Sequence, residues 1–144
     1  MIVLMADDDP DDCELVDAAF SEIENGNEIR FVEDGVELLQ YLRGEGPYDE
    51  PGTAPRPDLI LLDLNMPKID GREALAEIKA DPNLRRIPVV VLTTSKAEED
   101  IFRTYDLGIA GYITKPATFQ GLVDMSRSID QYWHHTVVIS PNGT

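Results

Sequence analysis

The chain has 144 residues, enough for one domain with a buried core, and its 28 acidic against 12 basic residues give a formal net charge of −16 at pH 7. So negative a surface repels phosphate backbones and anionic lipids, which disfavours direct binding to nucleic acid or to a membrane. The single cysteine cannot form an internal disulfide, and the apolar start MIVLM lacks the length and the basic flank of a signal peptide, so we expect a cytoplasmic protein.

Short apolar runs alternate with longer segments of helical periodicity along the chain. The runs predict strands over residues 2–6, 29–32, 59–63, 89–93 and 111–114. The segments between them predict helices that begin after Asp9, after Asp34 and at Gly71, with two more near 96–107 and 118–132. Runs as apolar as LILL and VVVL indicate strands covered on both faces. The predicted fold class is α/β, a doubly wound five-stranded parallel sheet with helices on both faces.

Two segments depart from this regular pattern. Residues 44–57, GEGPYDEPGTAPRP, carry Gly, Pro and charge without periodicity and predict an unusually long loop. Gly121 lies inside the last predicted helix, where glycine costs roughly 1 kcal/mol relative to alanine. We therefore expect this helix either to be locally loose or to be approached closely by a neighbouring group.

Polar residues follow the predicted strands at the ends where an open parallel sheet binds its ligands. They are Asp7, Asp8 and Asp9 after the first strand, Asp63 at the end of the third, Thr93 at the end of the fourth and Lys115 after the fifth. Because the carboxyl ends of parallel strands meet at one edge, several carboxylates, a hydroxyl and an ammonium group are expected to converge there.

The crowded aspartates of ADDDPDD divide into two groups with different expected roles. Carboxylates a few ångströms apart raise each other's pKa unless a cation lies among them, and an all-oxygen site suits Mg²⁺. Asp7 and Asp8 with Asp63 are therefore predicted to hold a divalent metal ion. The other three aspartates lie at the start of a helix, where anions interact favourably with its dipole, and Asp11 and Asp12 are expected to be merely solvated.

Other interpretations of this stretch fit less well. An EF-hand loop beginning at Asp7 needs glycine where Asp12 stands and glutamate where Ala18 stands. A nucleotide or flavin site needs a turn rich in Gly, Ser or Thr after the first strand, and DDDP would repel a phosphate group. Taken singly, Thr93 would be an ordinary strand residue and Lys115–Pro116 an ordinary turn, so only their joint placement indicates a site.

Four motifs in order resemble the CheY-like receiver domains of two-component response regulators. They are the acidic pair DD at 7–8, LLDLNMPKIDG at 61–71, VVVLTTS at 89–95 and GYITKP at 111–116. The resemblance covers nearly the whole chain and implies a flavodoxin-like sheet with strand order 2-1-3-4-5.

The resemblance also implies a phosphoacceptor chemistry at this edge. Asp63 would be the nucleophile that forms an aspartyl phosphate. Asp8, Asp63 and the backbone carbonyl of Asn65 would hold Mg²⁺ directly, and Asp7 would act mostly through a metal-bound water. Lys115 would stabilise the charge of the transferred phosphoryl group.

Further features carried by the resemblance concern support of the site and switching. Thr93 would move toward the new phosphate, and Tyr112 would change its rotamer in response. A cis peptide bond between Lys115 and Pro116 would aim the ammonium group into the site. On the predicted helix near 96–107, Ile101 and Tyr105 are expected to face outward as part of an interface.

The carboxyl-terminal sequence narrows the resemblance. YWHHTVVISP at 132–141, together with the long loop, is similar to the stand-alone regulators paired with bacterial and cyanobacterial phytochrome kinases. This group implies a histidine kinase partner of phytochrome type and a homodimer formed through 96–107, 111–114 and 118–132. We expect residues 1–132 to form the receiver domain and 133–144 an extension packed on the body or on a second subunit.

Two rival functions remain from other classes. A phosphatase of the haloacid dehalogenase type needs a second aspartate two residues after the nucleophile, where this chain has Asn65, and there is no room for a substrate cap. A pseudo-receiver that only docks to partners is opposed by the intact polar set at the strand ends. We therefore predict a signalling protein that supports its own phosphorylation and, because neither Asn65 nor Ser95 is a strong base, only slow dephosphorylation, rather than an enzyme.

Overall fold

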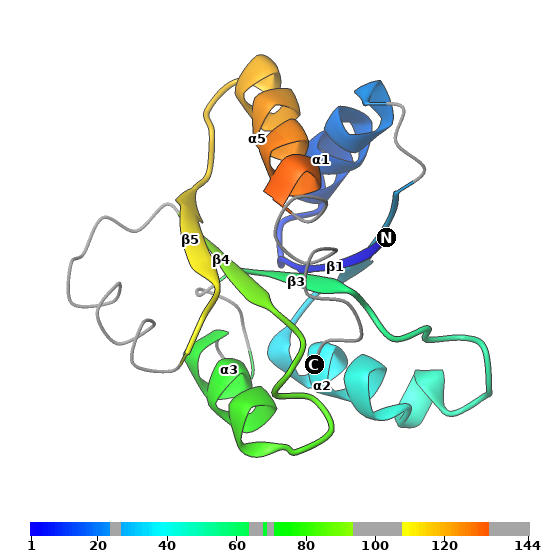
Figure 1. The fold of residues 1–144 in the computed structure, drawn as a ribbon. Coiled ribbons are helices and arrows are strands. Elements are labelled where there is room, and N and C mark those ends of the chain that lie inside the picture. Colours follow the sequence, from blue (N-terminus) through cyan, green and yellow to red (C-terminus); the bar gives the residue numbers. More distant parts are fainter. Residues whose placement is uncertain (24–26, 64–67, 69–70, 94–107, 133–144) are drawn as a thin grey trace.

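The computed structural model describes residues 1–23, 27–63, 68, 71–93 and 108–132, which are drawn in colour in Figure 1. The strands are β1 (Ile2–Ala6), β2 (Glu28–Val32), β3 (Leu59–Asp63), β4 (Val89–Thr93) and β5 (Gly111–Thr114). The helices are α1 (Pro10–Glu22), α2 (Gly35–Arg43), α3 (Gly71–Ala80) and α5 (Phe119–Tyr132), with a short 3-10 helix η1 (Gly46–Tyr48). All five predicted strands are confirmed, and the helix predicted near 96–107 lies outside the described residues.

The five strands form one parallel sheet in the order β2-β1-β3-β4-β5. Helices α1 and α5 pack together on one face, and α2 and α3 pack together on the other (Figure 1). Right-handed crossovers between parallel strands give this arrangement when the chain runs from β1 to β2 in one direction across the sheet and then from β3 to β5 in the other. The predicted fold class and strand order are confirmed. Within the described ranges, no helix combines the length and the apolar character needed to cross a membrane.

The sheet separates two apolar cores, one on each face. Along β1, Val3 and Met5 pack on the side of α1 and α5, whereas Leu4 and Ala6 pack on the side of α2 and α3. The same alternation places Leu59 and Leu61 of β3 in the first core. Because successive strand residues point to opposite faces, a strand segment that is buried on both faces must be apolar, as residues 59–62 of β3 are.

The two helices that follow β1 and β2 begin at aspartate caps. Asp9 precedes Pro10 in α1, and its side chain accepts the backbone N–H of Asp11 at 2.9 Å. Asp34 caps α2 by accepting the N–H of Glu37 at 2.8 Å. Burial by itself would raise the pKa of Asp34, but this bond and the Lys68 ammonium 3.2 Å away outweigh it and hold the pKa below its usual value. Such caps contribute about 1 kcal/mol each and fix where these helices start.

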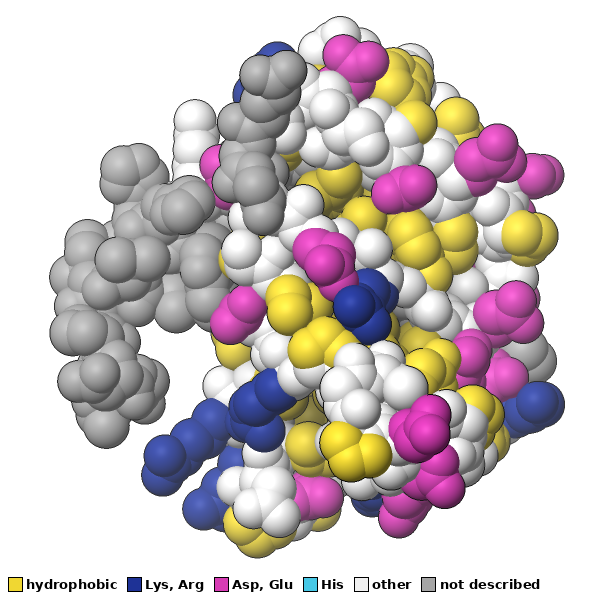
Figure 2. Space-filling view, turned by 90° about the vertical axis from the view of Figure 1, so that its right-hand side faces the viewer, with side chains coloured by type: hydrophobic (Ala, Val, Ile, Leu, Met, Phe, Trp, Pro, Cys, Tyr) yellow, Lys and Arg dark blue, Asp and Glu magenta, His cyan; other side chains and the backbone are white. Residues whose placement is uncertain are grey.

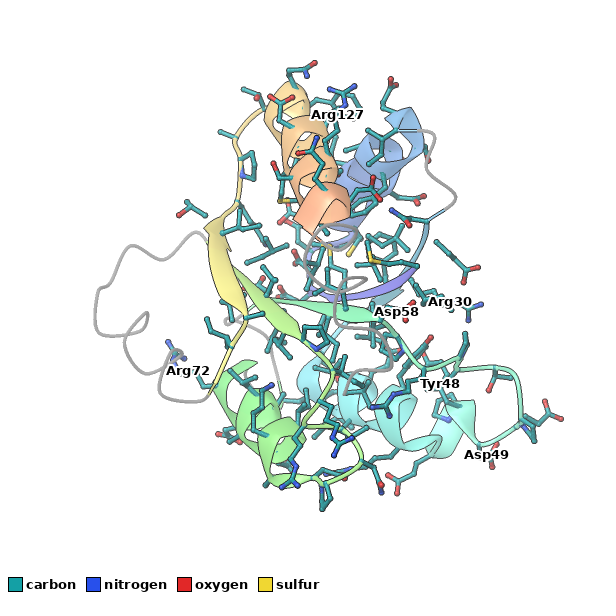
Figure 3. All side chains as sticks on the ribbon, in the orientation of Figure 1. Arg30, Tyr48, Asp49, Asp58, Arg72 and Arg127 are labelled. Carbon is teal, nitrogen blue, oxygen red and sulfur yellow. The ribbon has the colours of Figure 1, made fainter. Side chains whose placement is uncertain are left out.

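The long loop predicted at 44–57 is tied to the body by side-chain hydrogen bonds. The Tyr41 hydroxyl donates to the Pro55 carbonyl at 2.9 Å, and the Tyr48 hydroxyl donates to Glu37 at 2.8 Å. The two tyrosine rings meet edge to face, with their centroids 5.0 Å apart. Tyr48 lies beside α2 in Figure 3, with Arg30 above it. The absence of periodicity over residues 44–57 predicts a loop, and these side-chain contacts stabilise the shape of that loop.

The acidic excess of the sequence is visible on the surface. Figure 2 shows acidic side chains spread over the visible face among hydrophobic ones, while several Lys and Arg side chains gather at its lower left.

Candidate functional site

Two buried aspartates lie side by side at the carboxyl end of the sheet. Ala6 of β1 pairs with Leu62 of β3, so the next residues, Asp7 just after β1 and Asp63 at the end of β3, lie beside each other. Both are buried, with 1% and 7% of their surface exposed. By the alternation of strand residues, Asp7 follows Met5 and Asp63 follows Leu61 on the face of the sheet that α1 and α5 cover. Asp8 joins them, and the carboxylate oxygens of these three residues lie within 4.8 Å of one another. The predicted convergence of Asp7, Asp8 and Asp63 is confirmed as geometry.

Each carboxylate oxygen of Asp7 has its own donor. Oδ1 accepts the backbone N–H of Asp9 at 2.9 Å, and Oδ2 accepts the Lys115 ammonium at 2.7 Å. Burial nevertheless raises the pKa of Asp7, because the loss of hydration of the carboxylate has a larger effect than the stabilisation of its charge by these two hydrogen bonds. The charged form of Asp7 therefore gains from any additional cation at this edge.

Lys115 is the cation that these carboxylates share. It follows β5, and its Nζ atom lies 2.7 Å from Asp7 Oδ2, 3.0 Å from Asp12 Oδ2 and 3.2 Å from Asp63 Oδ2. Burial by itself would lower the pKa of Lys115, but the hydrogen bonds to Asp7 and Asp12 and the charge of Asp63 raise it above its usual value. The ammonium group stays protonated at any physiological pH and serves as a fixed positive charge.

The peptide bond between Lys115 and Pro116 is trans, so the predicted cis bond is wrong for this structure. The trans isomer of a bond before proline is favoured by about 0.5–1 kcal/mol unless the fold demands otherwise. Here the ammonium group of Lys115 reaches all three carboxylates without it.

Gly121 explains how the turn after Lys115 packs against α5. A Cβ atom at this position would lie 2.7 Å from Pro116 Cβ, closer than real contacts allow, and 3.1 Å from Thr118 Oγ1, which is a tight contact. The side chain of Thr118 accepts the Gly121 N–H at 3.0 Å and so begins α5. Of the two expectations for this glycine, close approach by a neighbour is the one observed.

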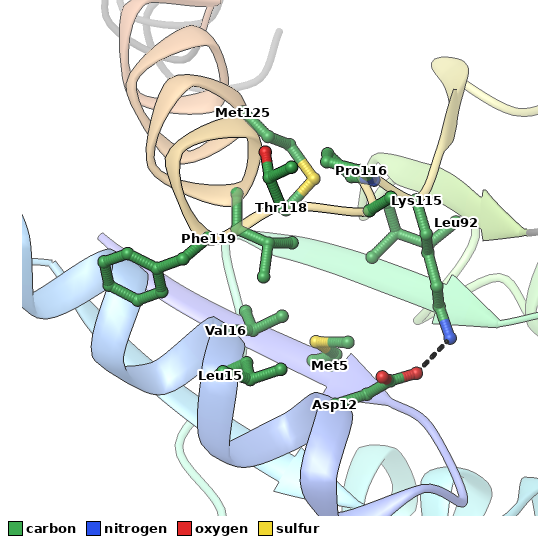
Figure 4. Close-up of a pocket in the computed structure, with 12 residues that line it drawn as sticks. Met5, Asp12, Leu15, Val16, Leu92, Lys115, Pro116, Thr118, Phe119 and Met125 are labelled. Atoms are coloured by element: carbon green, nitrogen blue, oxygen red, sulfur yellow. Dashed lines mark hydrogen bonds and ion pairs between the residues drawn. The ribbon is translucent and has the colours of Figure 1, made fainter.

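Asp12 is the site residue that sequence reasoning missed. Asp11 and Asp12 occupy the first turn of α1 and were both expected to be solvated, and Asp11 is indeed exposed. Asp12 instead turns toward Lys115 (Figure 4). A topological signal existed, because α1 and α5 share a face of the sheet and the residue after β5 emerges above the start of α1.

A pocket of about 290 Å³ lies beside this ion pair, between α1 and α5 (Figure 4). Asp12 and Lys115 stand at one end of it, and mostly apolar side chains line the rest. Leu15 and Phe119 at its rim are large apolar residues with 47% and 41% of their surface exposed. The acidic edge therefore continues into an apolar hollow on the α1 and α5 face.

The lone cysteine adds no reactive group to the site. Cys13 lies in α1 with its Sγ atom 3.7 Å from the Asp7 carbonyl oxygen. Burial and the neighbouring carboxylates of Asp7 and Asp12 raise the pKa of its thiol to about 12. Because the thiolate is the nucleophilic form, Cys13 is inert at neutral pH.

Several predicted residues fall partly or wholly beyond what the structure describes. Thr93 ends β4 and pairs in register with Thr114 of β5, so its backbone lies at the same edge as Lys115. The backbone of Tyr112 lies within β5. The side chains of these two residues, and all of Asn65, Ile101, Tyr105 and 133–144, are outside the described residues.

The chemistry of the donor set fits a small hard cation. Asp7, Asp8 and Asp63 supply oxygen atoms only, and two of the three carboxylates are buried. Hard divalent cations such as Mg²⁺ and Mn²⁺ prefer carboxylate oxygen, whereas zinc and copper favour nitrogen or sulfur. One ammonium group compensates only part of the negative charge at this edge, so a divalent ion would be electrostatically favoured.

Comparison with known proteins shows which family this sequence matches. The profile of the response regulator receiver domain matches residues 3–127. Among characterised proteins, the response regulator Rcp1 of Synechocystis sp. is 41% identical over 138 residues, which cover 96% of this chain and 92% of the relative.

Solved structures of related proteins match the whole fold. The phosphorylated cyanobacterial phytochrome response regulator RcpA has a TM-score of 0.84 and 48% identity, with 94% of each chain covered. The Mn²⁺-bound form of Rcp1 has a TM-score of 0.82 and 41% identity, covering 94% of this chain and 95% of that one. The response regulator RPA3017, in red light signalling of R. palustris, has a TM-score of 0.86 and 34% identity over 94% of each chain.

Proposed function

Because the chain belongs to the response regulator receiver domain family, and so is a phosphoacceptor signalling domain, we propose that Asp63 accepts the phosphoryl group from a partner histidine kinase. The observation that carries this proposal is the shared ammonium group. Lys115 lies within 3.2 Å of Asp63, at an edge where two further aspartates converge. A group that stabilises phosphoryl charge therefore lies against the proposed nucleophile.

The proposed reaction is a transfer between two protein side chains. A carboxylate oxygen of Asp63 attacks phosphorus while the P–N bond of the kinase phosphohistidine breaks, and the released imidazole nitrogen takes up a proton. Negative charge on the phosphoryl oxygens is greatest during this transfer, and the ammonium group of Lys115 is placed to stabilise it. The backbone position of Thr93 at the same edge agrees with a supporting role for its hydroxyl.

Asp7, Asp8 and Asp63 are the residues that would hold Mg²⁺, with the backbone carbonyl of Asn65 as the further ligand that the family resemblance implies. When bound, Mg²⁺ would offset the negative charge of the carboxylates and of the incoming phosphoryl oxygens. Burial of Asp7 and Asp63 limits the access of bulk water to their oxygens, and the resemblance implies that Asp7 would act mostly through a metal-bound water.

The proposed partner is a kinase of phytochrome type. Its support is likeness to RcpA and Rcp1, since the solved structure of RcpA is that of a phytochrome response regulator. We further propose a cytoplasmic receiver domain over 1–132 that signals through protein contacts, with 133–144 packed on the body or on a second subunit. Tyr112 would report the phosphorylated state to a dimer interface containing Ile101 and Tyr105, formed through 96–107, β5 and α5.

A docking module without phosphorylation is the less favoured alternative. Such a module has no need of buried carboxylates around a lysine, since each buried charge costs several kcal/mol unless it is paired. Asp7, Asp63 and Lys115 retain that arrangement here. The same proposal includes slow loss of the phosphate, because Asn65 and Ser95 offer no strong base to activate water.

The test is intact mass after incubation with acetyl phosphate, with and without Mg²⁺. Wild type should gain one phosphate only with metal, and Asp63→Asn should gain none. Asp58→Asn is the matched control, because Asp58 immediately precedes the same strand β3 and lies at its opposite end. Equal incorporation by wild type and Asp63→Asn would refute the assignment, and no incorporation by wild type would favour the docking module.

A further inference from the structure

The three carboxylates around Lys115 do not belong to the same set. Asp7 and Asp63 are both members of the group that could hold a metal ion, whereas Asp12 is not. Asp12 comes from the first turn of α1 rather than from a strand end, and its side chain is 37% exposed. Lys115 therefore contacts two of the proposed metal ligands, Asp7 and Asp63, and one carboxylate that is not a proposed metal ligand, Asp12.

A metal ion at this edge and the ammonium group of Lys115 would repel each other. A divalent cation held by the group of Asp7, Asp8 and Asp63 would lie near an ammonium group that is 2.7 and 3.2 Å from the Asp7 and Asp63 carboxylates. Like charges this close repel strongly in a partly buried site. Of the three carboxylates that Lys115 contacts, Asp12 is the one outside the group that could hold a metal ion, so its attraction for the ammonium group is not reduced by sharing its charge with a cation.

We propose that Asp12 is a positioning residue, which holds Lys115 at the edge of the site when Asp7 and Asp63 bind a divalent cation and gives the lysine up to the incoming phosphoryl group. The proposal rests on the proposed function of this edge and assigns a role to a residue outside its metal and phosphate ligands. Figure 4 shows the geometry, with Lys115 reaching down to Asp12 at the start of α1.

The proposal has two consequences of opposite sign. Without Asp12, the ammonium group would rest on Asp7 and Asp63 alone and would compete more strongly with a cation, so metal affinity should fall. Without Asp12, none of the described carboxylates outside the metal site would compete with a phosphoryl group for Lys115, so affinity for a phosphoryl mimic should rise once the metal site is saturated. A general loss of structure would instead weaken both.

The sequence provides a matched control for charge. Asp11 is the preceding residue in the same first turn, carries the same charge near the same helix dipole, and is exposed. Asp11→Asn thus removes an equal charge from the start of α1 without touching Lys115.

The experiment is calorimetric titration with MgCl₂, then with beryllofluoride at saturating Mg²⁺, of wild type, Asp12→Asn and Asp11→Asn. A hydrogen-bonded ion pair of this exposure corresponds to roughly a five-fold effect, so Asp12→Asn should weaken Mg²⁺ binding by about that factor and tighten beryllofluoride binding about two-fold. Asp11→Asn should change either affinity by less than about two-fold. The proposal would be overturned if the two variants had equal effects, or if Asp12→Asn weakened the binding of beryllofluoride as well as that of Mg²⁺.

A double-mutant cycle shows whether Asp12 acts through Lys115. In a Lys115→Met background, Asp12→Asn should affect Mg²⁺ binding no more than Asp11→Asn does, because no ammonium group remains to be held. A five-fold effect that persists without Lys115 would mean that Asp12 attracts the metal directly, which contradicts the positioning role. If wild type itself binds no Mg²⁺, the proposed function falls as well, and the two failures are thereby distinguished.

Discussion

The aspartates at the two ends of the parallel sheet have different hydrogen-bond and charge partners. At the amino end, Asp58 accepts the backbone N–H of Ile2 at 2.7 Å, and Asp130 accepts the Asn27 side-chain amide at 2.8 Å. Figure 3 shows Asp58 at this end of the molecule, near the start of β3. At the carboxyl end, three aspartates share the single ammonium group of Lys115. Neutral donors tie the first group into the fold, whereas the second group has more negative charge than Lys115 can neutralise.

This difference separates structural from functional carboxylates. A carboxylate that accepts one backbone N–H contributes to folding, and nothing about it requires a further ligand. A set of buried carboxylates with one shared cation costs folding energy and attracts further positive charge. Function at this sheet is therefore expected at the end where the charges are least compensated, and the following changes test that contrast.

The largest effect is expected from loss of the shared cation. Lys115→Met leaves buried Asp7 without its charged partner, and breaking a buried pair typically costs about 3–5 kcal/mol. We expect the free energy of unfolding of the metal-free protein, measured by urea denaturation, to fall by roughly 3 kcal/mol. Added Mg²⁺ should restore more stability to this variant than to wild type. A metal-free loss below about 0.5 kcal/mol would show that the carboxylates need no compensation.

A second change disturbs Lys115 from a distance. Gly121→Ala places a Cβ atom 2.7 Å from Pro116 Cβ, so the turn that follows Lys115 must shift. Overpacking of about 1–3 kcal/mol exceeds the helix propensity gained from alanine, and the stability should fall by about 1–2 kcal/mol. Phosphorylation by acetyl phosphate, followed by intact mass, should slow as well.

Gly111→Ala is the control for this change. A Cβ atom at Gly111 meets nothing within 4 Å, so neither stability nor phosphorylation should change appreciably. Normal phosphorylation of Gly121→Ala would mean that the position of Pro116 does not govern that of Lys115.

At the amino end the expected effect is smaller and confined to stability. Asp58→Ala leaves the N–H of Ile2 without the side-chain acceptor that it now has, which should cost about 1 kcal/mol in urea denaturation. Phosphate incorporation should equal that of wild type. Reduced incorporation would show that the two ends of the sheet are coupled.

The smallest effect concerns pH. Because burial raises the pKa of Asp7 above 3.8, the native protein takes up a proton at a higher pH than the unfolded chain does. The free energy of unfolding of the metal-free protein should therefore rise as the pH falls from neutrality through that raised pKa. Asp34, whose pKa is lowered, acts in the opposite sense, and its contribution is lost only below 3.8.

Denaturation at a series of pH values with Asp7→Asn beside wild type isolates the Asp7 contribution. The variant should show a weaker dependence than wild type in this range. Parallel curves for the two proteins would contradict the assignment to Asp7.

Local patterns in the sequence predicted most of the fold. Apolar runs bounded by turn residues located all five strands, because buried parallel strands have a pattern that few other elements share. Asp9 and Asp34 marked the starts of their helices because capping depends only on neighbouring backbone groups. Convergence of Asp7, Asp63 and Lys115 followed from topology, since parallel strands bring their carboxyl ends together.

Contacts between distant side chains could not be predicted in the same way. The pairing of Asp12 with Lys115 joins residues 103 positions apart and depends on how α1 packs against α5. The close approach of Pro116 to Gly121 depends on how the turn after β5 packs against α5. Periodicity describes one element at a time, so it carries no information on such details.

The most direct test of the central claim is to locate the phosphate. Borohydride reduces an acyl phosphate to the alcohol, so after treatment with acetyl phosphate and Mg²⁺ an aspartyl phosphate at position 63 becomes homoserine, which peptide mass spectrometry identifies. We expect homoserine at position 63 alone, within the carboxyl-end set of aspartates. Homoserine at Asp7, Asp8, Asp12 or Asp58 instead, with position 63 unmodified, would contradict the assignment of Asp63 as the phosphoacceptor.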